Sequence, residues 1–450
     1  MSAPPGRGPT GGTRSVADPG PRATGGIRPA VSGHAYPWDV LGDPDFPARA
    51  ADLGVGAVTL AAAYHSCRAA TPLHPTRQVV DASHAALYRR VRPEVWSGRR
   101  LAPLAPGWLS EPDPFGDAAR ILATAGLPVT AWVVLTHNTR LGTAHPDVAV
   151  VNCFGERYPY ALCPQWTEVR EYAATLAAEA CRDVPVEGVS LEACGQLGLT
   201  HLSHHEKTDG AWSPASVRLL SVCCCAACRA AWRARGLDDH RIVADLRAVV
   251  RALSASTEVD APVAELIGAE TAAGVLAARH AAATALRGEV LAGLPAGIRV
   301  TLHASPDPWA TGPSPGLAAA VATSPGLGVA ASPDQTVAAS PGLAVAASPG
   351  GAARALPGVS LPGVAGVLVP AWPTGPGTAA GVAAMRSAVG PEIRVGAYVT
   401  VLAPVGLDEV SGHVGRLRAA GADELHLYHL GLAPAGRHDG FAAAVKSFEG

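Results

Sequence analysis

From residue 30 onward, short apolar runs alternate with longer amphipathic stretches. The runs are rich in β-branched and aromatic residues and are bounded by glycine, proline or polar residues, which is typical of strands. They predict strands at residues 34–40, 56–63, 128–135, 187–193, 297–304, 365–371, 393–401 and 422–430. The stretches between them predict helices at residues 45–54, 117–126, 167–183, 379–390 and 408–421. Each of these helices ends at a glycine or a charged residue just before the next apolar run.

This alternation predicts right-handed βαβ units and a parallel sheet, so the fold class is α/β. Eight such units close into a (β/α)8 TIM barrel, whose active sites lie at the C-terminal ends of the strands. A doubly wound open sheet is the alternative. It is disfavoured because no glycine-rich dinucleotide fingerprint follows the first run.

Three connections are much longer than the others and predict rim insertions after strands 2, 4 and 5. They are residues 64–127, a helical cysteine-containing insertion at 194–296, and a low-complexity insertion at 311–364 with degenerate SPGL repeats. The repeated proline and glycine would break a helix about every eight residues, so we expect a poorly ordered segment there. Residues 1–30 are rich in Gly, Pro, Ser and Thr and predict a disordered tail before a barrel domain at 31–450.

Composition narrows the function classes. The 450 residues carry a net charge of −2, which gives no footprint for nucleic acid or an anionic membrane. No apolar run reaches the roughly 20 residues of a spanning helix, and the N-terminus has no export signal. We therefore expect a cytoplasmic protein with reduced cysteines, and a homo-oligomer is compatible with the sequence.

The segment VCCCAAC holds four of the nine cysteines. Cys223, Cys225 and Cys228 have spacings that allow several thiolates to reach one tetrahedral Zn²⁺, which a structural site binds through four ligands. Helices are expected on both sides, the first with Ser213 as its cap and Pro214 at its first position. The fourth ligand is expected from beyond the third strand, where Cys163 and Cys153 are candidates. We take Cys163, so the sequence predicts a structural zinc site; small buried thiols are the alternative.

Glu192 at the end of the fourth strand, followed by C-x-C-x-x-C and then Trp232, resembles the glycoside hydrolases, in particular the family 42 β-galactosidases and related glycoside-hydrolase-like barrels. The stretch ALCPQWTEVREYAATLA at 161–177 is also similar to a segment of those barrels. The resemblance implies hydrolysis of a glycosidic bond, a carbohydrate substrate, and Zn²⁺ held by the cysteine triplet with one cysteine from the third-strand rim.

The sequence departs from that family in two places. Leu191 stands before Glu192, where the family has asparagine, and the gap to the triplet is longer. The seventh strand, IRVGAYVTV, offers Tyr398 and Thr400 but no glutamate for the usual nucleophile.

Glycoside cleavage usually needs two carboxyl groups, about 5 Å apart for retention and about 6.5–9.5 Å for inversion. Glu192 and Asp39 are the candidate catalytic pair, and strands one and four face each other across the barrel, which favours inversion. The alternative for Asp39 is a capping role at the following helix. Aromatic rings and neutral hydrogen-bonding groups recur at the other predicted strand ends and suit a sugar. The candidate substrate-binding residues are Tyr64, His65, His137, Asn138, His204, His205, Glu206, His303, Trp372, Tyr398 and His429.

Two other functions remain open. A barrel that binds a carbohydrate without cleaving it is favoured by the missing seventh-strand carboxylate. A metal-dependent hydrolase would use His65, His137, His303 and Asp or Glu ligands, and would require the three histidines to converge on one ion. It is disfavoured because the first strand lacks an H-x-H pair.

Overall fold

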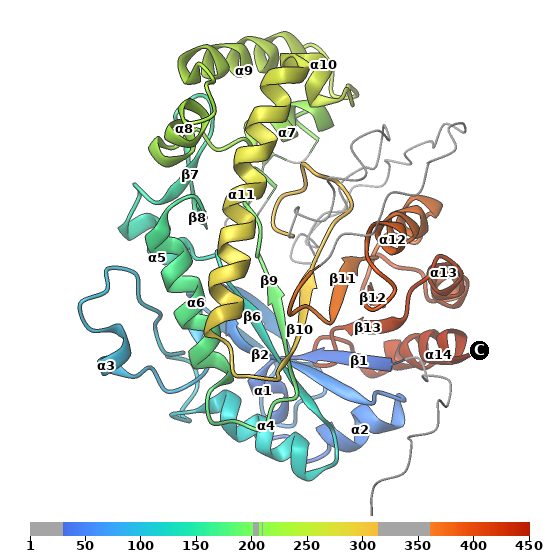
Figure 1. Cartoon of the computed structure of the whole chain (residues 1–450). Helices are drawn as coiled ribbons and strands as arrows, with labels where there is room; N and C mark the ends of the chain where they lie inside the picture. The colour runs from blue at the N-terminus through green and yellow to red at the C-terminus, as the bar shows by residue number, and fades with distance from the viewer. Residues whose placement is uncertain (1–29, 201–206, 209, 314–360) are drawn as a thin grey trace, which may run out of the picture.

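The computed structural model of the chain is a closed (β/α)8 barrel (Figure 1). It describes residues 30–200, 207–208, 210–313 and 361–450. The parallel strands follow the order β1-β2-β6-β9-β10-β11-β12-β13, and β13 pairs with β1 to close the barrel. Their bounds are β1 Ala30–Ala35, β2 Ala57–Tyr64, β6 Val129–Val134, β9 Gly188–Glu192, β10 Arg299–His303, β11 Gly366–Pro370, β12 Arg394–Thr400 and β13 Glu424–Tyr428. The predicted fold class is confirmed.

The first strand was predicted at the wrong residues. β1 covers Ala30–Ala35 and not 34–40, and residues Pro37–Val40 form the short helix α1. Proline suits the first helical position because its ring fixes φ at a helical value. It also has no N–H, and an N–H at this position would have no acceptor within the helix. The carboxyl of Asp39 then accepts a hydrogen bond from the backbone N–H of Tyr36 at 2.7 Å, which caps the turn. The other strands match their predicted ranges to within two residues at either end.

Alternating residues give the barrel strands two different faces. Val189 and Leu191 on β9, like Val300 and Leu302 on β10, are buried apolar residues that turn toward the surrounding helices. The residues between them point into the barrel, where the Ser190 hydroxyl lies 3.2 Å from His303 Nε2 of the neighbouring strand. The barrel lumen is therefore built from polar and aromatic side chains, while the hydrophobic core lies between the sheet and the helices.

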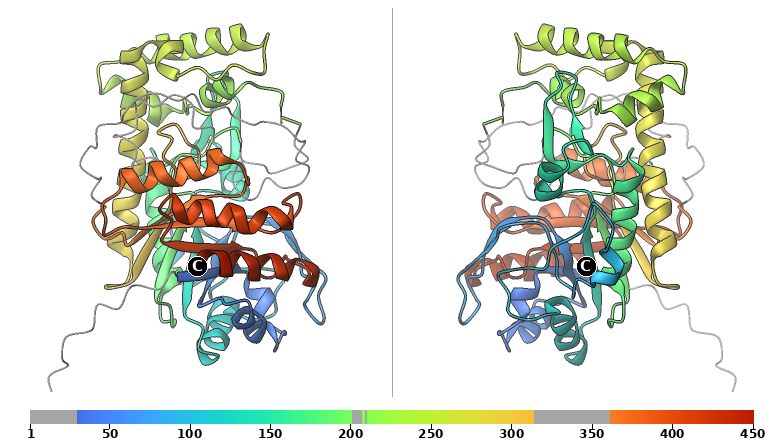
Figure 2. Two further views of the ribbon diagram at one scale, coloured as in Figure 1. Left: turned by 90° about the vertical axis from the view of Figure 1, so that its right-hand side faces the viewer. Right: turned by 90° about the vertical axis from the view of Figure 1, so that its left-hand side faces the viewer.

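Helices cover the outside of the barrel. They are α2 Phe46–Asp52, α4 Pro114–Thr124, α6 Thr167–Cys181, α12 Pro376–Ala388, α13 Leu407–Ala419 and α14 His438–Glu449. A short 3-10 turn, η3 Ala435–Arg437, leads into α14. Figure 2 shows α12, α13 and α14 side by side on one flank. None of the helices in the described residues is long and apolar enough to cross a membrane.

The connections after β2 and β6 carry small extra elements. After β2 come the hairpin of β3 Cys67–Ala70 and β4 Val79–Ala82, the two-residue strand β5 Ala86–Leu87 and the helix α3 Pro93–Trp96. After β6 come α5 Thr139–Ala144 and a second hairpin, β7 Ala149–Val151 with β8 Arg157–Leu162. The sequence analysis did not predict these hairpins.

The connection after β9 is largely helical. It contains α7 Pro214–Leu220, α8 Ala226–Arg233, α9 Asp239–Leu253, α10 Val263–Ile267 and α11 Ala269–Gly293. In Figure 1, α7–α10 lie beyond the C-terminal ends of the strands, and α11 runs from there along α6. Apolar side chains of these helices, such as Leu219, Leu246 and Val275, form a second hydrophobic cluster apart from that of the barrel. The predicted tail and the SPGL repeats lie mostly outside the described residues.

Candidate active site and cysteine centre

Glu192 lies at the C-terminal end of β9, with 8% of its surface exposed. Trp132 on the neighbouring strand β6 donates a hydrogen bond from Nε1 to Glu192 Oε2 at 2.7 Å. On the other side, His303 Nδ1 of β10 lies 3.8 Å from the same carboxyl oxygen. The parallel register pairs Glu192 with Val134 and Trp132 with Ser190, so Trp132 lies one side-chain level below Glu192 in the lumen and its indole N–H reaches up to the carboxyl group. Glu192 is thus a carboxyl group held in place from both adjacent strands.

Aromatic and imidazole rings surround this carboxyl group. Tyr64 meets Trp132 with ring centroids 4.5 Å apart, and Tyr36 stacks on His429 at 4.2 Å. On the other side, Trp372 packs on Tyr428 at 4.7 Å. These rings come from β2, β6 and β13 and from the segments that directly follow β1, β11 and β13, and they form one contiguous lining.

His34 and Tyr398 lie in the same lining, from β1 and β12. Their ring centroids are 4.4 Å apart, and His34 also meets Trp132 edge-on at 4.9 Å. Burial, together with the nearby His426 and His303, holds the pKa of His34 well below its usual value. His34 is therefore a neutral ring at pH 7.

Asp39 occupies the first turn of α1, and only 3% of its surface is exposed. Besides capping Tyr36, its Oδ2 lies 3.7 Å from His429 Nδ1, and its Oδ1 has no hydrogen-bond partner in the described structure. A Cβ at Gly431 would lie 2.1 Å from the Asp39 carboxyl carbon, so only glycine fits there. Burial raises the pKa of Asp39 to about 8, although the Tyr36 N–H opposes this shift. The carboxyl group is mostly protonated at pH 7.

Asp39 and Glu192 are connected through rings. On one side, Tyr36 stacks on His429, which lies beside Asp39. On the other side, the Tyr36 ring centroid lies 6.1 Å from that of Trp132, which donates a hydrogen bond to Glu192. The structure therefore brings both predicted carboxyl groups to this end of the barrel, with Asp39 behind the ring layer. Its role as the second catalytic carboxyl stays a prediction.

β12 supplies Tyr398 and Thr400 but no carboxylate, as its sequence indicates. The remaining lumen acid, Glu424, is the first residue of β13 and lies at the opposite end of that strand from the site. It pairs with Arg394 Nε at 2.8 Å and with His426 Nε2 at 3.2 Å. Burial alone would raise its pKa, but the hydrogen bond and charge of His426 and the charges of Arg299 and Arg394 lower it to about 2. Glu424 is thus a structural carboxylate.

The other predicted sugar-binding residues are distributed over the rim. His65 stacks against His137 with ring centroids 4.3 Å apart, and its Nδ1 lies 2.8 Å from the Ser66 carbonyl. Asn138 caps α5 by accepting from Leu141 N at 3.0 Å. His204, His205 and Glu206 lie outside the described residues.

The three histidines of the metal-hydrolase alternative do not form a metal site. His65 and His137 stack on each other, whereas His303 bonds Ser190 beside Glu192. Within the described part of the chain, the only group of ligand side chains arranged to hold a metal ion consists of cysteines.

That group is Cys163, Cys223, Cys225 and Cys228, whose sulfur atoms all lie within 4.8 Å of one another. All four are buried, and none of the cysteines is in a disulfide. Cys163 Sγ lies 3.5 Å from Cys228 Sγ and 3.8 Å from Cys225 Sγ. Zn–S bonds of about 2.3 Å in a tetrahedron put neighbouring sulfurs about 3.8 Å apart, so the sulfur positions fit one such ion.

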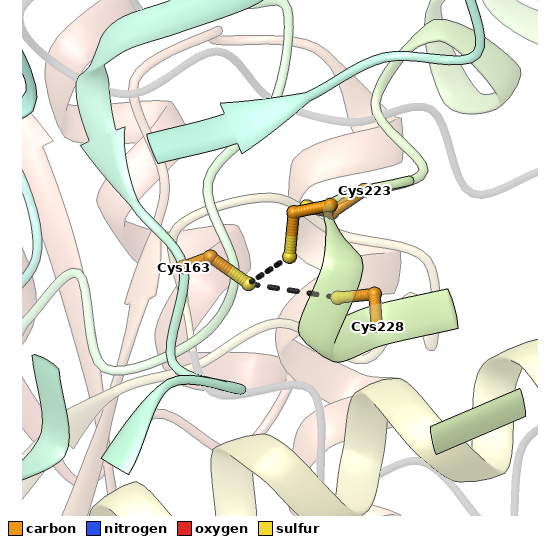
Figure 3. A group of neighbouring side chains, drawn as sticks. Cys163, Cys223 and Cys228 are labelled. Carbon is orange, nitrogen blue, oxygen red and sulfur yellow. Dashed lines mark hydrogen bonds between the residues drawn. The ribbon is translucent and has the colours of Figure 1, made fainter. Parts of the chain in front are cut away.

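Two segments bring these cysteines together. Cys163 directly follows β8, and the triplet spans the junction of α7 and α8 (Figure 3). Ser213 caps α7 by accepting from Ser216 N at 3.2 Å, with proline at the first position, as predicted. The N–H of Cys224 donates to the Val151 carbonyl of β7 at 2.6 Å, which fixes the junction to the hairpin.

Cys153 and Cys224 lie outside the group. Cys153 belongs to the second hydrophobic cluster, and its carbonyl accepts a hydrogen bond from Arg247 Nε. Burial raises the pKa of the Cys153 thiol to about 11. Of the two candidates for the fourth ligand, only Cys163 is therefore in position.

The thiols of the group share protons. Hydrogen bonds from Cys163, Cys223 and Cys228 lower the pKa of Cys225, whereas hydrogen bonding to the neighbouring thiols raises the pKa values of Cys163 and Cys228. A divalent cation would displace the remaining protons, so its binding strengthens as the pH rises.

No protein-family model matches the sequence, and no curated protein sequence matches it. Among solved structures, an α-L-fucosidase isoenzyme 2 from Paenibacillus thiaminolyticus superposes with a TM-score of 0.50 at 11% identity, covering 93% of this chain. The fold is a glycoside-hydrolase-like (β/α)8 barrel. This chain spans 49% of the length of that fucosidase structure.

Two further glycoside hydrolases have lower TM-scores. The catalytic domain of a β-amylase from Paenibacillus polymyxa gives a TM-score of 0.49 at 12% identity, covering 92% of this chain and 96% of that one. A β-galactosidase from Marinomonas ef1 gives 0.49 at 10% identity, covering 93% and 59%. At such identities the likeness concerns the fold.

The sequence analysis missed Trp132, His34 and Ser190 as parts of the site. Trp132 stands in the apolar run PVTAWVVL, where it reads as core. The alternation of side chains along each strand could have identified Ser190, because it stands two residues before Glu192 and therefore lies on the same face of the strand.

Proposed function

We propose that this chain is a glycoside-hydrolase-like enzyme that cleaves a small saccharide or glycoside by carboxyl acid/base catalysis. The observation that carries the proposal is the setting of Glu192, which is held by Trp132 and approached by His303 inside a lining of aromatic rings. Ring faces suit the apolar faces of a pyranose, and a fixed carboxyl group is suited to protonating the departing glycosidic oxygen.

The chain's residues would divide the work as follows. Glu192 would donate the proton to the leaving group, and the rings of Tyr64, Trp372 and Tyr428 would bind the sugar. Because β12 brings no carboxylate, a glycosyl ester on that strand is not part of the proposal. Instead, water would attack the anomeric carbon with inversion as the glycosidic bond breaks, and its proton would pass to the imidazole of His429. Asp39, buried against His429, would act by orienting that ring.

The test is release of nitrophenol from a panel of 4-nitrophenyl glycosides. We expect turnover of at least one glycoside and a lower kcat/KM in Glu192→Gln. The fall on these substrates should stay below the loss of about 10²–10⁴-fold that is usual for an acid/base group, because nitrophenol departs with little protonation. Glu156→Gln is the matched control, because Glu156 is an exposed carboxylate bonded to Asn152 on the β7–β8 hairpin. Turnover unchanged in Glu192→Gln on the corresponding phenyl glycoside as well, whose leaving group needs protonation, would exclude Glu192 as the acid.

A barrel that binds carbohydrate without cleaving it is the second candidate, favoured by the absence of a carboxylate on β12. It predicts saturable binding of a saccharide by titration calorimetry with no turnover of any glycoside in the panel. Substituting Trp372 would weaken that binding, because ring faces carry it.

We also propose that Cys163, Cys223, Cys225 and Cys228 hold a structural Zn²⁺, which when bound would tie the α7–α8 junction to the end of β8. Sulfur ligands and a closed four-fold site favour zinc over calcium or magnesium. Metal analysis is expected to find one zinc per chain in the wild type and in Cys153→Ser, and none in Cys163→Ser. Free thiols throughout the chain support a cytoplasmic location.

A further inference from the structure

Arg279 lies on α11 and points into the space next to the cysteine group. It lines a small cavity of about 10 Å³ together with Cys163, Cys223 and Cys228. Only 6% of its surface is exposed, which is unusual for an arginine. Among the residues that line this cavity, it is the one basic side chain.

The guanidinium of Arg279 is only partly bonded. Its Nη2 donates to the carbonyls of Ala310 and, at 3.4 Å, of Gln196. Its Nε and Nη1 have no hydrogen-bond partner in the described structure. Buried N–H groups without an acceptor are costly, so these two nitrogens favour a neighbouring acceptor, and an anion most of all because the guanidinium is positively charged.

A loaded cysteine centre would be such a neighbour. Four thiolates around one divalent cation carry a net charge of −2, which a buried site must balance. Burial lowers the pKa of Arg279 to about 10, while Asp307 and the cysteines raise it, so the side chain stays charged at pH 7.

The carbonyls that Arg279 does bind belong to the barrel rim. Gln196 lies four residues after Glu192, and Ala310 lies seven residues after His303. Gly312 and Gln196 also bond each other across these two loops, Gly312 N to Gln196 O at 3.1 Å. Arg279 therefore lies between the cavity that it shares with the cysteine group and the loops that follow Glu192 and His303.

We propose that Arg279 is the countercharge of the metal-loaded cysteine centre and links that centre to the loops that follow Glu192 and His303. This inference rests on the proposed metal site. It assigns Arg279 as a positioning residue, which acts on the rim loops through the charge and hydrogen bonds of its guanidinium.

The test measures Zn²⁺ affinity by competition with a chromophoric chelator, with Co²⁺ absorption reporting the thiolate ligands. We expect Arg279→Met to bind zinc about 10–100-fold more weakly, the usual effect of losing a group that supports metal ligands. Arg279→Lys keeps the charge and should lose less. Arg287→Met is the matched control, because Arg287 is a half-buried arginine on the same helix that faces Cys194; its affinity should equal that of the wild type.

Amide hydrogen exchange tests whether Arg279 links the cysteine centre to the rim loops. Zinc binding should slow exchange at residues 195–198 and 310–312 in the wild type and in Arg287→Met, but not in Arg279→Met. Equal zinc affinity in wild type and both Arg279 variants would overturn the inference while leaving the metal site intact. A wild type that binds neither Zn²⁺ nor Co²⁺ would overturn both proposals.

Discussion

Glu192 depends on the residues directly beside it in the sheet. The indole N–H of Trp132 orients the carboxyl group of Glu192, and His303 is fixed in turn by the hydroxyl of Ser190. Since these four residues come from three adjacent strands, the register of β6, β9 and β10 determines the geometry of the site. A shift of one residue in any strand would turn its side chains out of the lumen.

Asp39 provides a prediction about pH and stability. Its pKa is raised from 3.8 to about 8 in the folded protein, so folding takes up a proton over that range. This contribution to stability is fully present below about pH 4 and is lost progressively as the pH rises to about 8, by about 1.4 kcal/mol per pH unit. In Asp39→Asn, whose amide oxygen can still accept from Tyr36, this loss should vanish.

The measurement is urea unfolding of the wild type and Asp39→Asn at several pH values between 4 and 9. As the pH rises, the unfolding free energy of the wild type should fall relative to that of Asp39→Asn. If the unfolding free energies of the two proteins changed in parallel with pH, Asp39 would be ionised in the folded state, which would contradict this prediction.

Among the secondary-structure elements, the strands could be predicted because apolar residues recur at every second position on the face that packs against the helices. Runs such as GIRVTLHA place Val300 and Leu302 against the helices, and this alternation is visible in the sequence. The first strand was misplaced because WDV has strand-forming residues, and the helix there is induced by Pro37 and the Asp39 cap. The β7–β8 hairpin was missed because β7 has only three residues and the chain turns back at Gly155, which has a φ of 90°.

The candidate site could be predicted only where its residues are close together in the sequence or stand at the end of a predicted strand. The triplet Cys223, Cys225 and Cys228 stands out in the sequence, and so does Glu192 at a strand end. Choosing Cys163 over Cys153 requires the packing of the hairpin on α7–α8, which no local pattern encodes. Arg279 gives no signal either, because an arginine on a helix is ordinarily exposed.

The α7–α8 junction gives a prediction about metal removal. The metal would join this junction to the end of β8, so a chelator should lower the unfolding temperature and expose the junction. Limited trypsin digestion should then cut after Arg218, Arg229 and Arg233, and Zn²⁺ should restore protection. Cys163→Ser should be cut in the same way without a chelator, and Cys153→Ser should resist. Equal cleavage with and without chelator would contradict a structural metal at this junction.

At the scale of the whole molecule, the cysteine group lies where two cores meet. Its cysteines pack in the barrel core, whereas Leu219 and Trp232 on the flanking helices belong to the second cluster. The insertion after β9 therefore forms a small body of its own, held against the barrel rim by α11 along α6 and by the cysteines (Figure 1). This arrangement connects the metal site to the candidate active site without making the metal a reactant.

The lumen also bears on function. Barrel interiors are usually filled by branched apolar residues, but this one contains His34, His303, His426, Tyr398 and Tyr428. Such a lumen contributes less hydrophobic burial and is better explained by a polar ligand at the strand ends. We therefore take Glu192 as a proton donor to a glycoside.

Leaving-group dependence tests that claim most directly. A proton donor matters for a poor leaving group and little for a good one, so wild type and Glu192→Gln should be compared on phenyl, 4-nitrophenyl and 2,4-dinitrophenyl glycosides of one sugar. We expect a loss of about 10²–10⁴-fold in kcat/KM for the phenyl glycoside and almost none for the dinitrophenyl glycoside. The same loss on all three substrates, or no loss on any, would contradict it.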